Sequence, residues 1–119
     1  MSELSEIQQA VLVEGLDDWV GLWTVAREVR EGGGRASEVV RQQVVDLIRQ
    51  LNEAGYVRVG HPTSEGTFRA WKLSPAEAAE RIGEEWSALG RDPDIGEICW
   101  LENTELGDEV ARQVGRPKR

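Results

Sequence analysis

Cys99 and His61 are the residues of this chain that most resemble a nucleophile or a general base, and each is the only residue of its type. Cys99 lies between Ile98 and Trp100 in an apolar run, which predicts a buried thiol without an activating neighbour. His61 precedes Pro62 in a turn-rich loop, where no partner that would orient the imidazole is evident. One histidine and one cysteine cannot form an ordinary structural zinc site. We therefore expect no enzymatic activity, no metal and no cofactor.

A glycine run at residues 32–34 precedes Arg35, Ala36 and Ser37, where Ser37 is the expected N-cap of a helix. Backbone amides in such a run can hold an anion at a helix N-terminus. The run lacks the lysine and the spacing of a P-loop, so a flexible turn is the better interpretation.

Arginine and glutamine side chains project outward from the helix that begins at Ser37, and further arginines follow on the predicted strands. Such residues can contact guanine and adenine edges or phosphates. The set with this potential is Arg35, Arg41, Gln42, Arg49, Arg58 and Arg69. Glu38, Asp46 and Glu53 share the same helix, so a solvated face of mixed sign is the alternative interpretation.

Carboxylates gather farther along the chain, on one face of the predicted helix 74–90 and in the loop that follows it. A surface of this kind can attract a basic protein partner and accelerate the encounter, although acidic faces often serve only solubility. Trp23 lies off the apolar stripe of its own helix, which makes it the best candidate for an exposed interface anchor, although packing against the first helix is the favoured role. The predicted partner-binding set is Glu77, Glu80, Glu84, Asp92, Asp94 and Trp23.

Charge is unevenly distributed along the 119 residues, which carry 22 acidic and 14 basic side chains and a net charge of −8. Residues 35–73 have a net charge of +2, whereas the segments before and after them each have −5. No apolar run approaches the roughly 20 residues that span a bilayer, and the first residues are acidic, unlike a signal peptide. With a single cysteine, these features lead us to expect a cytoplasmic protein without a membrane partner.

Hydrophobic spacing predicts the elements that must position these side chains. We expect helices near residues 4–14, from Asp17 or Asp18 to about 31, over 37–54, over 74–90 and over 104–114, with strands at 56–59, 67–73 and 98–101. Ser5 with Gln8, and Ser74 with Glu77, have the spacing of capping boxes. The sheet is expected to have three strands.

The segment Val39–Val59 ends as Leu51-Asn52-Glu53-Ala54-Gly55-Tyr56-Val57-Arg58-Val59. This ending, after helix, helix, turn and helix and before two strands, resembles winged-helix regulators of the MarR and PadR type over about residues 4–73. The resemblance implies a helix in the major groove and a wing on the backbone. The stretches from Trp71 and from Trp100 both resemble the exit from the wing, so helix 74–90 either follows a short wing or precedes the third strand.

The sequence thus predicts an α+β, winged helix-turn-helix domain over residues 1–114, with a small antiparallel sheet, added C-terminal helices and a frayed basic tail at 115–119. We interpret it as a non-enzymatic module that binds a basic protein partner through an acidic surface, as an immunity or regulatory protein would. The alternative is a small DNA-binding transcriptional regulator. Homodimerisation through the last helix also stays open.

Overall fold

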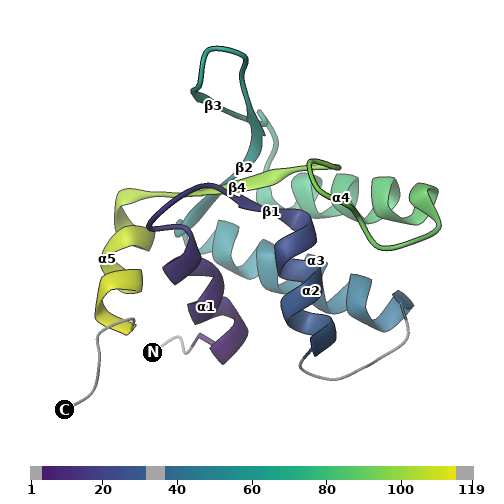
Figure 1. Ribbon diagram of the computed structural model, residues 1–119, viewed down its shortest axis with the longest axis horizontal. Helices are drawn as coiled ribbons and strands as arrows, with labels where there is room; N and C mark the ends of the chain where they lie inside the picture. Colours follow the sequence, from purple (N-terminus) through teal and green to yellow (C-terminus); the bar gives the residue numbers. More distant parts are fainter. Residues whose placement is uncertain (1–3, 32–36, 115–119) are drawn as a thin grey trace.

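Five helices and four strands form the part of the chain that the computed structural model describes, residues 4–31 and 37–114 (Figure 1). Their order is α1 (Glu6–Glu14), β1 (Val20–Gly21), α2 (Leu22–Glu31), α3 (Ser37–Glu53), β2 (Val57–Pro62), β3 (Phe68–Ala70), α4 (Pro75–Leu89), β4 (Trp100–Asn103) and α5 (Glu105–Val114). The predicted α+β class is confirmed. The glycine run with Arg35 and the basic tail lie outside the described residues.

Local sequence signals define the ends of two helices. At α1 the Ser5 hydroxyl accepts from the Gln8 amide while the Gln8 side chain accepts from the Ser5 amide. At α4 Ser74 and Glu77 form the same reciprocal pair, and Gly90 ends the helix in the left-handed conformation at φ 70°. Both predicted capping boxes are therefore confirmed, because they depend only on residues three positions apart.

The sheet has four antiparallel strands in the order β1-β4-β2-β3, so the prediction of three strands is wrong. The missed strand is β1, where Val20 pairs with Leu101 and Gly21 with Trp100. This pairing takes Val20 and Gly21 out of the predicted second helix, which begins at Leu22 and not at residue 17 or 18.

The two predicted placements of α4 are each partly realised. β3 pairs with β2 as a short hairpin, and β4, which follows α4 in the chain, pairs with the other edge of β2. In sequence, β3 and α4 therefore come between β2 and β4, which are neighbouring strands in the sheet. Figure 1 shows the hairpin extending away from α1, α2, α3 and α5, which lie below the sheet.

One face of the sheet packs on the helices and supplies the core. Val57, Val59 and Leu101 are each 5% exposed or less and join buried residues of all five helices. Side chains alternate across a strand, so Arg58, Gly60, Trp100 and Glu102 belong to the opposite, outer face. That outer face carries the aromatic ring of Trp100 and the charged groups of Arg58 and Glu102.

Candidate functional site: an acidic protein-interaction surface

Cys99 and His61 are both fully occupied by structural roles. Burial raises the pKa of the Cys99 thiol, which has no exposed surface. The predicted lack of a partner for His61 is wrong: its Nε2 lies 2.8 Å from the Ile98 carbonyl oxygen, and its Nδ1 accepts from the Trp71 indole N–H at 3.0 Å. The partners lie 10 and 37 residues away, which local inspection of the sequence cannot reveal. Among the described residues, no group of three or more metal-ligating side chains is suitably placed for an ion.

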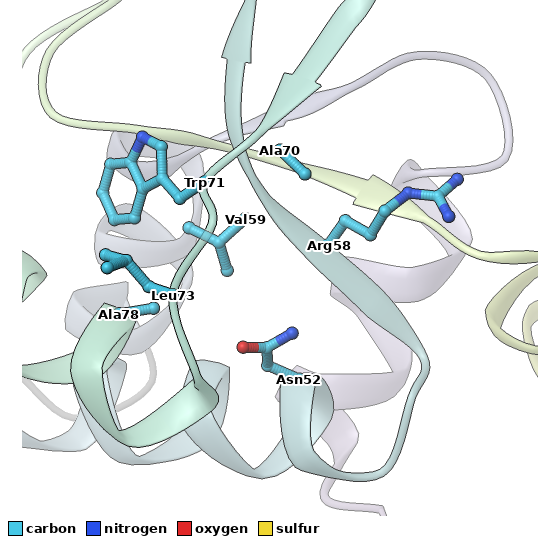
Figure 2. A pocket seen from close by; sticks show the side chains of 7 residues that line it. All are labelled: Asn52, Arg58, Val59, Ala70, Trp71, Leu73 and Ala78. Carbon is cyan, nitrogen blue, oxygen red and sulfur yellow. The ribbon is translucent and has the colours of Figure 1, made fainter.

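A pocket of about 260 Å³ lies where α3, the β2–β3 hairpin and the start of α4 meet (Figure 2). The Asn52 amide in this pocket already donates to the Val57 carbonyl oxygen at 2.9 Å. Figure 2 shows the Arg58 guanidinium turned away from Trp71, and Arg58 pairs with Glu102 at 3.0 Å. The polar groups of the pocket are thus engaged within the chain.

The described residues of the predicted DNA-reading set are mostly paired with neighbours on the same element. Arg49 Nε lies 2.8 Å from Glu53, the Gln42 amide donates to Asp46 at 3.0 Å, and Arg41 lies 3.8 Å from Glu38. Arg58 pairs across the sheet with Glu102, as stated above. Arg69 on β3 is exposed and has no ion pair with any described residue.

Helix α4 packs alongside α3, on the side where the predicted base-reading residues lie. A groove of about 460 Å³ runs between the two helices. From α3 it is lined by Arg41, Gln42, Val45, Asp46 and Arg49, and from α4 by Ala76, Ala79, Glu80 and Gly83. The small side chains on α4 permit this close approach, and Ala79 is 7% exposed. The sequence-predicted acidic residue Glu80 thus lies next to the predicted DNA-reading residues.

The acidic face of α4, defined as Glu77, Glu80 and Glu84, is exposed along its length. Glu77 also accepts the Ser74 amide in the capping box at 2.9 Å. Glu80 and Glu84 make no ion pair with any residue of the two described ranges, 4–31 and 37–114. Because Glu80 and Glu84 are four positions apart, they project from the same side of the helix as uncompensated carboxylates.

Of the two loop residues predicted to extend this acidic face, Asp92 is neutralised within the chain, whereas the Asp94 carboxylate is exposed and has no ion pair with a described residue. Asp92 forms an ion pair with Arg30 on α2 at 2.8 Å. Glu97 accepts from Arg91 at 2.8 and 2.9 Å and from the Asp94 amide at 2.7 Å. These hydrogen bonds, led by the one from Arg91, lower the pKa of Glu97 to about 2.

Trp23, the candidate exposed anchor, is only partly exposed and packs over the sheet. Its ring meets Trp100 edge to face, with centroids 4.7 Å apart and an interplanar angle of 88°. A Cβ added at Gly21 would collide with the Trp23 ring, so glycine is required where this indole crosses β1. Trp23 is half-buried over β1 and β4, and Trp100 is the partner that the sequence-based interpretation missed.

Comparison of the chain with protein-family models, with curated proteins and with solved structures gives no match. Within the described ranges, none of the helices combines the length and the apolarity needed to cross a bilayer.

Proposed function

We propose that this chain is a non-enzymatic, winged-helix-type module that binds a basic protein partner through the acidic face of α4, as an immunity or regulatory protein would. The observation that carries the proposal is the position of α4 beside α3, with Glu80 in the groove that contains Arg41 and Arg49. The order of three helices followed by a hairpin supports the winged-helix part of the proposal.

Helix width argues against insertion of α3 into DNA. The major groove is about 12 Å wide and admits one helix, whose diameter with side chains is about 10–12 Å. Helix α4 packs about 8–10 Å from α3 and borders the same groove as Arg41, Gln42 and Arg49, so the base-reading side of α3 is shared with a second helix that the major groove would also have to admit. A protein surface has no such limit on width.

Charge argues in the same direction. The exposed charged residues of α3 are Glu38, Asp46, Arg49 and Glu53, which leaves an acidic excess on the ridge that would approach phosphates. Binding to duplex DNA gains most of its strength from cations that neutralise phosphates. The same excess favours a partner with a basic surface.

DNA binding is the second candidate function, and Arg69 is the residue that favours it. Arg69 lies exposed on the hairpin, where a wing would contact the phosphate backbone. Lys72, just after β3, is also exposed and has no ion pair with a described residue. Two such cations supply two phosphate contacts, whereas specific binders neutralise several phosphates. We therefore rank DNA binding below protein binding.

A charge-reversal experiment with a matched control tests the proposal. The double variant Glu80→Lys with Glu84→Lys and the control Glu31→Lys with Glu109→Lys each change two exposed carboxylates and shift the net charge equally. The tagged parent protein should capture a basic polypeptide from native lysate in a salt-sensitive complex. The α4 variant should lose that polypeptide, whereas the control should retain it. Undiminished capture by the α4 variant, or recovery of duplex DNA as the bound species, would contradict the proposal.

A further inference from the structure

The outer face of the sheet bears a row of aromatic rings on the side opposite the helical core. Trp19 and Phe68 have ring centroids 5.7 Å apart and Trp23 and Trp100 have centroids 4.7 Å apart. All four residues are half-buried, so part of each side chain reaches solvent. The chain contains five tryptophans, one tyrosine and one phenylalanine, so most of its aromatic residues lie on this face. We name these four residues the outer aromatic face.

The register of the strands places the rings together. Gly21 pairs with Trp100, Trp100 pairs with Gly60, and Gly60 pairs with Ala70. Glycine at position 21 leaves room for the Trp23 ring, whereas a Cβ at Gly60 would collide with the backbone of β3. A single hydrogen bond from the Trp19 indole N–H to Glu102 Oε2, at 3.1 Å, fixes Trp19 over the sheet.

Carboxylates surround the Trp19 end of this face. Hollows of about 300 and 110 Å³ both include Asp17, Asp18 and Trp19 in their linings. Glu14 borders the smaller hollow and Asp108 the larger one. Within the part of the chain that the structure describes, none of these four carboxylates forms an ion pair. The local field of these carboxylates is therefore negative, and no ion pair with a described residue compensates it.

We propose that the outer aromatic face is a second docking surface, which binds an arginine- or lysine-bearing segment of a partner protein. Indole faces attract guanidinium and ammonium groups that lie over them, and tryptophan and arginine dominate the energetics of protein interfaces. Aromatic platforms also stack nucleic-acid bases, but the carboxylates beside Trp19 repel phosphates. Charge complementarity thus selects a basic polypeptide. The inference rests on the proposed function in one respect, that the partner is basic. The outer aromatic face itself is separate from α4.

The test uses NMR of the isotope-labelled full chain, in which the five tryptophans each contribute an indole N–H signal. The probe is a short peptide of alternating glycine and arginine, and the reference peptide carries uncharged citrulline in place of arginine. Signals of Trp19 and Trp100 should shift with the arginine peptide, whereas that of Trp86, a residue of α4 that is 2% exposed, should not. The citrulline peptide should cause much smaller shifts.

Isosteric variants complete the test. Asp17→Asn with Asp18→Asn should weaken binding of the arginine peptide by about threefold to tenfold, as expected for two partly screened charge contacts. The control Glu31→Gln with Glu109→Gln should bind as the parent does. Absence of shifts at Trp19 and Trp100, equal shifts with citrulline, or equal affinity of the asparagine variant would each overturn the inference. Shifts confined to α4 would overturn this inference and leave the proposed function intact. Loss of partner capture by the Glu80→Lys/Glu84→Lys variant, with no change in arginine-peptide binding, would show that the two surfaces act independently.

Discussion

His61 links the hairpin to the turn that precedes β4, and its replacement by phenylalanine should loosen both. The imidazole lies 2.8 Å from the Ile98 carbonyl oxygen and 3.0 Å from the Trp71 indole nitrogen. Ile98 adopts φ 71°, a left-handed conformation that is costly for a β-branched residue. The hydrogen bond to its carbonyl helps to hold this conformation. Phenylalanine preserves the ring contact with Trp71 but can make neither hydrogen bond.

The expected loss follows from the two partners that His61→Phe leaves behind. A hydrogen bond contributes about 0.5–1.5 kcal/mol, and a buried partner left without one costs about 1–3 kcal/mol. The groups around His61 are only half-buried, so water can compensate in part, and relaxation of Ile98 recovers some strain. We therefore expect a destabilisation of about 1–3 kcal/mol. For a domain of this size, this lowers Tm by about 4–12 °C.

Thermal unfolding followed by circular dichroism measures this loss, and the indole N–H signal of Trp71 reports the local change. Thr67→Val is a suitable control, because it removes an exposed hydrogen bond to Thr63 at the hairpin tip and should cost less than about 0.5 kcal/mol. The reasoning is refuted if His61→Phe melts at the parent temperature and the Trp71 signal stays at its parent position.

Three further outcomes test separate parts of the structure. Because the pKa of Glu97 is lowered to about 2 from 4.5, its NMR titration should have a midpoint near pH 2, and Arg91→Gln should raise that midpoint. The ionised Glu97 side chain stabilises the fold above about pH 4.5, and this contribution declines as the pH falls toward 2. Cys99 is fully buried and the pKa of its thiol is raised, so a thiol reagent should modify it only after unfolding, and rapid modification of the folded protein would contradict this. Gln8 is 4% exposed and its amide donates to two acceptors on α3, so Gln8→Leu should cost about 1–3 kcal/mol in a denaturant titration, clearly more than Gln9→Leu.

Helix positions could be predicted well because their signals are local. The start of α4 is set by Ser74 and Glu77, three residues apart, and its end by Gly90. Its apolar stripe repeats at spacings of three and four residues. Helix α3 likewise follows from the spacing of Val40, Val44 and Leu51, which are fully buried. Such elements need no knowledge of the rest of the chain.

Features that depend on distant residues could not be predicted. β1 is only two residues long and exists because Val20 meets Leu101 across the sheet, whereas the sequence around Val20 equally fits the start of a helix. The position of Trp23 depends on Trp100 in the same way. For the candidate site, the acidic face of α4 follows from helical spacing, but the packing of α4 against α3 does not. The Asp17-Asp18-Trp19 run was the available signal for the outer aromatic face, and its interpretation as a helix start concealed it.

Zero-length crosslinking of carboxylates to lysines in native lysate, followed by mass spectrometry, tests most directly whether this chain binds a basic protein. The account predicts crosslinks from Glu80 or Glu84 to lysines of one basic polypeptide, and their loss when both glutamates are replaced by glutamine. Recovery of the chain with nucleic acid and without crosslinks from α4 would contradict it.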